Sequence, residues 1–238
     1  MTSRIESATS RPAVIFDMDG VLVDSYQAHF ESWRRLAEEC GRSLTRDEFS
    51  SLFGRTSGDI LDRVWGAPPP LGERKEMEER KERYYRDILE KEFKPMDGAA
   101  DLAQALLEHG FLLAVGSSGP PENIALVVHK LGLTGHIPVQ ITGRDVTRGK
   151  PDPQVFLLAS RQLGVRPGDC AVIEDAPAGI AAALAAKMVA VGLAGTVPIE
   201  KLRHAHRVVG SLRELTPQSI ARLIREPRAG HQCPPSTR

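Results

Sequence analysis

An apolar run that ends in two aspartates constrains this chain more than any other feature. Residues 12–16 read Pro-Ala-Val-Ile-Phe and are followed by Asp17, Met18, Asp19 and Gly20. A short, continuous run of β-branched and aromatic residues is typical of a strand buried on both faces of a parallel sheet. Open α/β sheets bind their ligands at the carboxyl ends of the strands, so we expect Asp17 and Asp19 to lie at a binding edge.

The spacing of the two aspartates would let both carboxylates act on one substrate group. Side chains alternate across a strand, so Asp17 and Asp19 project the same way if the extended backbone continues past Phe16. Gly20 then lets the chain turn away sharply. An isolated Asp-x-Asp-Gly segment is more often a turn with solvated acids. Its place directly after a buried-type strand instead favours a catalytic edge that handles phosphate.

The other apolar runs predict the fold class. They alternate with segments that have the period of helices, and this alternation is typical of an α/β protein with a Rossmann-like, doubly wound parallel sheet. The runs that we expect to form strands are residues 14–16, 111–115, 137–141 (a weaker run), 171–173 and 189–193.

One interval in this pattern is too long for an ordinary crossover. A strand–helix–strand unit takes about 30 residues, yet the first run begins at residue 14 and the second at residue 111. The interval contains no good strand but has helical patterns at residues 26–40, 45–52, 57–65 and 72–92. We therefore predict an all-helical cap domain, residues 26–94, with hinges near Ser25 and Pro95. The core domain would then consist of residues 1–25 and 95–238.

Two kinds of segment are expected to have no catalytic or binding role. Residues 1–11 and 227–238 are predicted to be loose tails of the core domain. The run 73–83 mixes acidic and basic residues at the four-residue spacing of a solvated helix face. We prefer that interpretation of the run to a binding surface.

Composition limits the partners and the location. The 238 residues are 41% hydrophobic and 26% charged, which suits a soluble globular protein with a full core. The 31 basic and 31 acidic residues cancel, so no net field would draw the chain to nucleic acid or to an anionic membrane. We find no membrane-length apolar stretch and no signal peptide in the first residues. The expected location is the cytoplasm, and the three cysteines, which cannot all pair, suit a reducing compartment.

Three later segments place polar residues directly after expected strands. Ser117 lies in a Gly/Ser/Pro loop before a helical pattern, where its hydroxyl and the exposed amides would form a small anion site. Lys150 precedes a proline, which disfavours helical backbone at the lysine and leaves it at the head of the next helix. A fixed ammonium there would stabilise a phosphate. Glu174 and Asp175 close the run 171–173, although Asp175 would also serve as an ordinary helix cap.

The predicted sheet brings four acids to one edge. Asp17, Asp19, Glu174 and Asp175 would repel one another without compensation, and a hard divalent cation with oxygen ligands resolves that conflict. Magnesium is the natural choice because it keeps waters and bridges carboxylates to phosphate.

The same residues resemble the four ordered motifs of the haloacid dehalogenase superfamily. The matching segments are Asp17 to Ser25, Ser117, Gly149 to Pro153, and Glu174-Asp175. The similarity covers about residues 12–193. The arrangement resembles the branch that carries a helical cap after the first motif, which includes β-phosphoglucomutases and phosphoglycolate-type phosphatases. The resemblance depends on the order and spacing of all four motifs, since each motif alone would be weak.

The resemblance implies a role for each polar residue at the edge. Asp17 would be the nucleophile that becomes a transient aspartyl phosphate. Asp19 would be the general acid that protonates the leaving oxygen and then the base that activates water. Ser117 and Lys150 would hold the phosphoryl oxygens.

The resemblance also implies the metal ligands. The carboxylates of Asp17 and Asp175 and the backbone carbonyl of Asp19 would bind Mg²⁺, and Glu174 would assist directly or through water. Asp19 further argues against carbon–halogen cleavage, because displacing a halide requires no proton for the leaving group.

We therefore predict a Mg-dependent phosphatase that acts on a small phosphorylated metabolite, either a sugar phosphate or a phosphoglycolate-like compound. His29 and Trp33 in the first cap helix resemble the mutase branch, although Trp33 also suits the cap core. The mutase pattern has an arginine where this chain has Ser57, and Arg55 lies two positions away. Arg55 and Tyr85 are further candidates for substrate contact. A β-phosphoglucomutase-type mutase and a non-catalytic sugar-phosphate sensor stay as alternatives, and the oligomeric state is not predicted.

Overall fold

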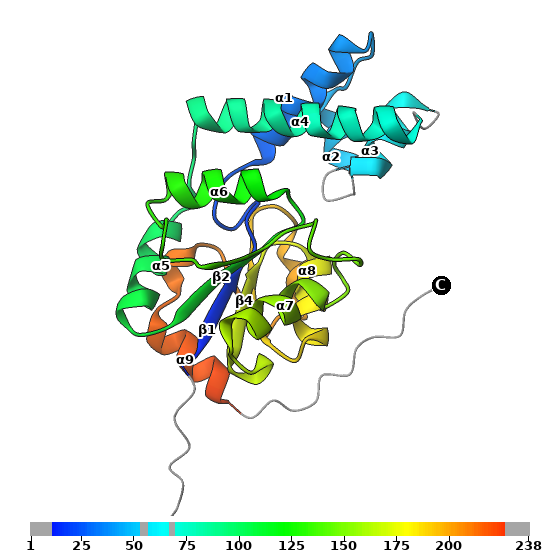
Figure 1. The fold of residues 1–238 in the computed structure, drawn as a ribbon. Coiled ribbons are helices and arrows are strands. Elements are labelled where there is room, and N and C mark those ends of the chain that lie inside the picture. Colours follow the sequence, from blue (N-terminus) through cyan, green and yellow to red (C-terminus); the bar gives the residue numbers. More distant parts are fainter. Residues whose placement is uncertain (1–10, 53–56, 67–69, 227–238) are drawn as a thin grey trace, which may run out of the picture. The chain divides into compact units, whose positions relative to one another are not determined.

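The chain folds as two compact units in its computed structural model, which describes residues 11–52, 57–66 and 70–226. The core unit comprises Met1–Leu22 and Asp97–Arg238, and the helical unit comprises Val23–Met96. Figure 1 shows the chain coloured along its sequence, and each unit is described here by itself. Among the described residues, no helix combines the length and the apolar character needed to cross a membrane.

Within the described residues, a six-stranded parallel sheet forms the centre of the core unit, in the order β3-β2-β1-β4-β5-β6. This confirms the predicted fold class. The sequence missed β6, because two adjacent valines are too short a run to stand out. The strands are β1 (Ala13–Phe16), β2 (Leu112–Gly116), β3 (Val139–Ile141), β4 (Cys170–Glu174), β5 (Val189–Leu193) and β6 (Arg207–Val209).

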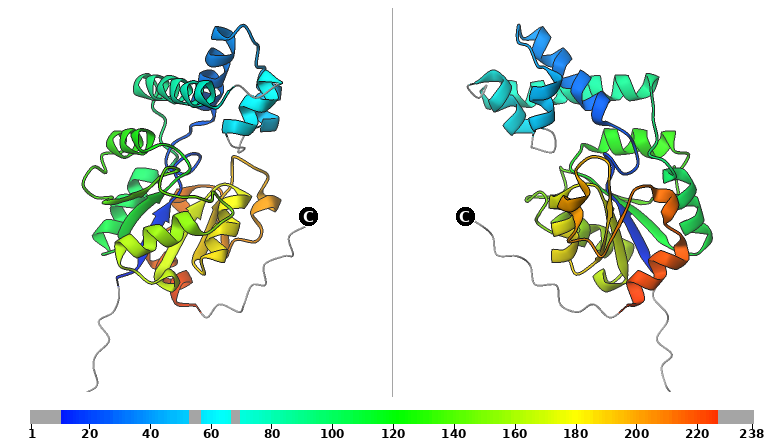
Figure 2. Two further views of the ribbon diagram at one scale, coloured as in Figure 1. Left: turned by 45° about the vertical axis from the view of Figure 1, so that its right-hand side comes forward. Right: turned by 180° about the vertical axis from the view of Figure 1, so that it is seen from behind.

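Helices cover both faces of this sheet (Figure 2). Right-handed crossovers produce this arrangement when the chain winds first to one side of β1 and then to the other. One face carries α7 (Gln154–Leu163) and α8 (Pro177–Ala185), and the other carries α5 (Ala99–Glu108), α6 (Pro121–Lys130) and α9 (Pro217–Arg225). The core unit also contains the short 3-10 helices η1 (Pro167–Asp169), η2 (Ile199–Leu202) and η3 (Leu212–Glu214).

Strand β1 is buried on both faces, which explains its unbroken apolar sequence. Ile15 belongs to a hydrophobic core shared with Phe156 of α7 and Ile180 of α8. Val14 and Phe16 point to the opposite face because side chains alternate along a strand, and they are also fully buried. Polar side chains can therefore follow β1 only where the strand ends, which is where the two aspartates stand.

The helical unit consists of α1 (Tyr26–Glu39), α2 (Arg46–Leu52), α3 (Ser57–Trp65) and α4 (Leu71–Lys91), with ends within one residue of those predicted. Its hydrophobic core includes Phe30, Trp33 and Phe49. The chain enters and leaves this unit side by side, since the backbone N–H of Asp24 donates to the carbonyl of Lys94 at 2.9 Å.

One face of α4 is buried at four-residue spacing by Met77, Lys81, Tyr85 and Leu89. Lys81 is only 2% exposed. The prediction that the run 73–83 is a solvated face is therefore wrong at Lys81. The burial follows from helical geometry, because Lys81 lies one turn from both Met77 and Tyr85 and shares their face.

Candidate active site

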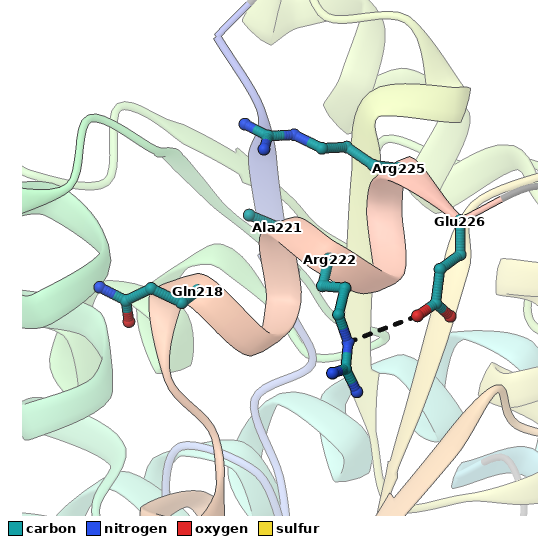
Figure 3. Close-up of a pocket in the computed structure, with 5 residues that line it drawn as sticks. All are labelled: Gln218, Ala221, Arg222, Arg225 and Glu226. Atoms are coloured by element: carbon teal, nitrogen blue, oxygen red, sulfur yellow. Dashed lines mark ion pairs between the residues drawn. The ribbon is translucent and has the colours of Figure 1, made fainter.

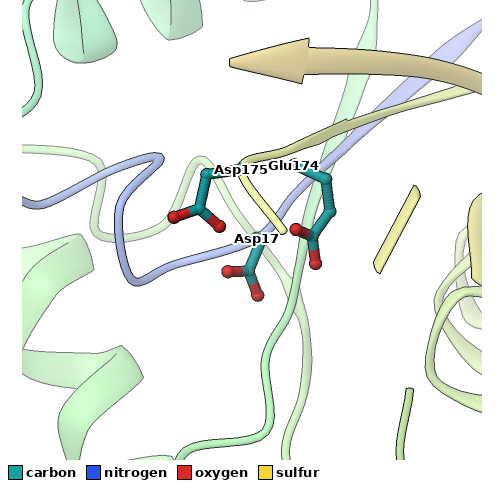
Figure 4. Close-up of side chains that lie close together, drawn as sticks. All are labelled: Asp17, Glu174 and Asp175. Atoms are coloured by element: carbon teal, nitrogen blue, oxygen red, sulfur yellow. The ribbon is translucent and has the colours of Figure 1, made fainter. Parts of the chain in front are cut away.

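Three buried acids meet at the carboxyl ends of β1 and β4 (Figure 4). Asp17 follows β1, Glu174 is the last residue of β4, and Asp175 follows it. One carboxylate oxygen from each lies within 4.8 Å of the others. We call these three residues the acid cluster.

The register of the sheet explains why residues so far apart in sequence meet. Strands β1 and β4 are adjacent and parallel, with Phe16 opposite Ile173. The backbone N–H of Asp17 continues this ladder by donating to the carbonyl of Ile173 at 3.0 Å. Since both strands end at this point, Asp17, Glu174 and Asp175 are delivered to one edge of the sheet, as predicted from the sequence.

Lys150 links two members of the acid cluster. It lies between β3 and α7, and its Nζ is 2.6 Å from Asp17 Oδ1 and 2.6 Å from Glu174 Oε1. The Lys150 and Asp17 side chains are each 11% exposed and that of Glu174 is 1% exposed. These are buried, charge-assisted hydrogen bonds, which are stronger than hydrogen bonds between neutral groups.

Burial and mutual repulsion shift the pKa values of these groups. Burial first, and then the charge of Glu174, raises the pKa of Asp175 to about 7. Burial also raises the pKa of Asp17 well above its ordinary range, against the lowering effect of Lys150. Burial alone would lower the pKa of Lys150, but the charges of Asp17 and Glu174 outweigh it and raise that pKa. With all three acids ionised, the cluster would hold more negative charge than one ammonium compensates.

Asp175 is supported by two residues that pack against it. The side chain of Thr196 forms a hydrogen bond with Asp175, which opposes the upward shift of its pKa. Gly20 has a φ of +73°, and a Cβ there would lie 2.0 Å from Asp175 Oδ2 and 2.8 Å from Thr196 Oγ1. Thr196 was not predicted from the sequence, although it follows the carboxyl end of β5, where open α/β sheets bind their ligands.

Ser117 is buried directly after β2, the other neighbour of β1. Its Oγ accepts a hydrogen bond from the backbone N–H of Gly119 at 3.0 Å. A Cβ on Gly119 would lie 3.4 Å from both Ser117 Oγ and Met18 Cε. Because Met18 stands between Asp17 and Asp19, the Ser117 loop borders the segment that carries both aspartates.

Asp19 is half-buried and stands outside the acid cluster. Its charge is a smaller contributor to the raised pKa of Asp175, after burial and Glu174. The carboxylate of Asp19 therefore lies near enough to Asp175 to act on it electrostatically. Its roles as proton donor and as carbonyl ligand stay predictions.

The residues predicted to contact substrate from the cap belong to the helical unit. His29 Nδ1 lies 2.8 Å from Lys81 Nζ, and the His29 ring stacks on Tyr85 with centroids 4.3 Å apart. Trp33 is buried in the hydrophobic core of this unit, so the alternative interpretation of Trp33 as a core residue fits its surroundings, and Tyr85 is also buried. Arg55 lies outside the described residues. The burial of Lys81 was not predicted, although its four-residue spacing from Met77 and Tyr85 along α4 indicates it.

The acid cluster fits a divalent metal ion. It offers only oxygen ligands, which Mg²⁺ prefers. Its three carboxylates are close together, and a cation between them would offset the burial and the mutual repulsion that raise the pKa values of Asp17 and Asp175. The neighbouring Lys150 adds a fixed positive charge beside Asp17.

A pocket on the surface of α9 lies elsewhere in the core unit (Figure 3). Arg222 Nε pairs with Glu226 Oε1 there at 3.4 Å. Helix α9 contacts η1, which leads into the amino end of β4, so this pocket lies at the opposite edge of the sheet from the acid cluster. The residues that line it are Gln218, Ala221, Arg222, Arg225 and Glu226.

Comparison with known proteins agrees with this geometry. A family model described as haloacid dehalogenase-like hydrolase matches residues 12–187. The β-phosphoglucomutase of Bacillus subtilis (strain 168) is 32% identical over 193 residues, which cover 79% of this chain and 85% of that protein. The phosphorylated carbohydrates phosphatase of Thermotoga maritima is 33% identical over 178 residues, which cover 73% of this chain and 81% of that protein.

A solved structure extends the similarity to the fold. The crystal structure of a HAD hydrolase of family IA, variant 3, from Entamoeba histolytica superposes with a TM-score of 0.83. Its sequence is 29% identical, and the match covers 90% of this chain and all of the other (100%).

Proposed function

Because this chain belongs to the haloacid dehalogenase-like hydrolase family, we propose that it is a Mg-dependent phosphatase that hydrolyses a small phosphomonoester through an aspartyl phosphate. The observation that carries the proposal is the contact of Asp17 with Lys150 at 2.6 Å, inside an acid cluster at the end of β1. A buried carboxylate beside a fixed ammonium suits a nucleophile that must approach an anionic phosphoryl group. The phosphatase relatives support this choice of reaction.

In the proposed first step, Asp17 accepts the phosphoryl group. A carboxylate oxygen of Asp17 attacks phosphorus, and the bond between phosphorus and the ester oxygen breaks. Asp19 donates a proton to that leaving oxygen, so the alcohol departs neutral. Lys150, and the hydroxyl of Ser117 at the neighbouring strand end, hold the phosphoryl oxygens.

In the proposed second step, water releases the phosphate. Asp19, now a carboxylate, takes a proton from a water molecule whose oxygen attacks phosphorus. The bond between phosphorus and Asp17 breaks, which restores the Asp17 carboxylate and returns Asp19 to its protonated form. No oxidant or further co-reactant is required.

We propose that Asp17, Asp175 and the backbone carbonyl of Asp19 hold Mg²⁺, with Glu174 assisting. When bound, the metal supplies positive charge that offsets the repulsion among the acids and the substrate phosphate. Thr196 would keep the Asp175 carboxylate in place for this role.

The proposed substrate class is a sugar phosphate or a phosphoglycolate-like metabolite. The helical unit, inserted between Leu22 and Asp97, would act as the cap that excludes bulk water and selects the substrate. We assign no substrate contact to Trp33, because it is buried in that unit's own hydrophobic core. A panel of phosphorylated metabolites assayed with Mg²⁺ would identify the substrate.

A β-phosphoglucomutase-type mutase is the second candidate, favoured by the 32% identity to the Bacillus subtilis enzyme. A mutase must grip a second phosphate while the first is transferred, and this chain has Ser57 where the mutase pattern has an arginine. We therefore rank hydrolysis first. Interconversion of glucose 1-phosphate and glucose 6-phosphate at rates that match hydrolysis would reverse this order.

Replacing the proposed nucleophile tests the mechanism. Asp17→Asn should abolish turnover of p-nitrophenyl phosphate in Mg²⁺, while the variant should fold at least as stably, because it removes a buried charge whose pKa is raised by burial. Asp101→Asn, at an exposed carboxylate of the same unit, is the matched control and should keep full activity. Retained turnover in Asp17→Asn would contradict the covalent mechanism.

A further inference from the structure

Gly179 lies against the carboxylate of Glu174. It is the third residue of α8, the helix that follows β4, and it is buried. A Cβ built on Gly179 would lie 1.7 Å from Glu174 Oε1, 1.9 Å from Cδ and 2.6 Å from Cγ. These separations are far below any van der Waals contact, so a side chain at position 179 and the present position of the Glu174 carboxylate exclude each other.

The Glu174 carboxylate has little room to move elsewhere. Its Oε1 accepts a hydrogen bond from Lys150 Nζ at 2.6 Å, and its Oε2 accepts one from the backbone N–H of Ala176 at 2.8 Å. The side chain is 1% exposed. Both oxygens are therefore engaged, and a displaced carboxylate would lose at least one of these bonds inside a buried site.

We propose that Gly179 is a positioning residue for the site. By leaving out a Cβ, it lets the Glu174 carboxylate lie where it holds Lys150, and Lys150 in turn reaches Asp17 at 2.6 Å. Gly179 thus acts on the proposed chemistry through two intermediate side chains. The proposal rests on the proposed function only for its activity readout, because the packing relation can be measured on the folded protein alone.

The proposal can be tested by whether a Gly-to-Ala substitution raises or lowers the stability of the fold. Alanine is a better helix former than glycine, so Gly→Ala in an open helical position raises stability. Gly72, the second residue of α4, is such a position, since no atom of the described part of the chain lies within 4 Å of an added Cβ. We expect Gly72→Ala to raise the midpoint of urea unfolding and Gly179→Ala to lower it, with both measured in chelator.

A double substitution separates positioning of Glu174 from general packing. Glu174→Ala removes the three atoms that the added Cβ would meet, so Gly179→Ala in the Glu174→Ala background should no longer lower the midpoint. Glu174→Gly, which also lacks Cγ, Cδ and Oε1, provides the same comparison if the alanine variant folds poorly. For activity on p-nitrophenyl phosphate, Gly179→Ala alone should lower kcat/KM by at least 10-fold, and adding it to Glu174→Ala should cause no further loss.

Two results would overturn the proposal: a midpoint for Gly179→Ala that rises as for Gly72→Ala, or one that falls equally with and without the Glu174 side chain. The second result would show that Gly179 makes room for something other than Glu174. A wild-type protein that hydrolyses no phosphomonoester would refute the proposed function, and the unfolding experiments would still decide the role of Gly179.

Discussion

Replacing Lys150 by methionine removes the ammonium that joins the buried carboxylates of Asp17 and Glu174. Methionine keeps an unbranched chain of similar length, so the packing changes little while the charge is lost. Asp17 Oδ1 and Glu174 Oε1, each 2.6 Å from Lys150 Nζ, then face each other and Asp175 without that positive charge.

The size of the effect follows from the burial of the partners. Removing one member of a buried ion pair typically costs about 3–5 kcal/mol, because the remaining charge stays desolvated. Lys150 has two partners, so the upper part of that range is expected for the metal-free protein near pH 8. Such a loss is a large part of the total stability of a domain, about 5–15 kcal/mol. The cost should shrink near pH 5, because Asp17 and Asp175, whose pKa values burial raises, can then take up protons.

Urea unfolding in chelator, followed by far-UV circular dichroism, measures this loss. Lys75→Met is the matched control, since the Lys75 side chain is 80% exposed in a surface ion pair, and such pairs contribute about 0–1 kcal/mol. If Lys150→Met cost no more than the Lys75 variant at pH 8, or cost as much at pH 5 as at pH 8, the buried charges would not be coupled as described.

Three further outcomes are expected. The folded protein holds a proton on Asp175 up to about pH 7, whereas an unfolded aspartate releases it near pH 4. The free energy of unfolding should therefore fall as pH rises from about 4 to 7 in chelator, and Asp175→Asn should flatten this slope in urea titrations at several pH values. Thr196→Val should weaken Mg²⁺ binding by about 10-fold or more, as measured by calorimetry, whereas Thr196→Ser, which keeps the hydroxyl, should not. Trp33→Ala should destabilise the helical unit by about 3–5 kcal/mol, and a loss below 1 kcal/mol in thermal unfolding would contradict its place in that core.

The fold was predictable wherever periodicity was strong. The buried runs of β1, β2, β4 and β5 are apolar on both faces, so their sequences needed no knowledge of neighbouring strands. Strand β6 was missed because Arg207–Val209 is an edge strand with one flank unpaired in the described sheet, and its few residues lack a pattern. Lys81 was predicted to be exposed because it is charged, although its four-residue spacing from Met77 and Tyr85 places it on their buried face.

The residues of the site that lie at or directly after the ends of strands could be predicted from the sequence. Asp17, Glu174 and Asp175 meet because two adjacent strands stop together, a consequence of topology that the sequence pattern already contained. Thr196 follows the end of β5, so the same reasoning would have found it, whereas Gly179 escaped prediction because the space beside Glu174 depends on the exact approach of helix α8. Such short-range relations appear only once the backbone is placed.

An excess of buried carboxylates over ammonium groups in the site underlies both the proposed chemistry and the expected stability changes. The acid cluster contributes three carboxylates against the single ammonium of Lys150, all nearly inaccessible to water. Burial of like charges raises the pKa values of Asp17 and Asp175, costs stability as pH rises, and favours any ligand that brings positive charge. Anything that binds only the folded state stabilises it by mass action, by about 2.7 kcal/mol at a concentration 100 times its dissociation constant. The pH dependence, the loss on removing Lys150 and the stabilisation by Mg²⁺ are therefore not independent. If the first two failed while Mg²⁺ still stabilised the fold, the metal would have to bind somewhere other than the acid cluster.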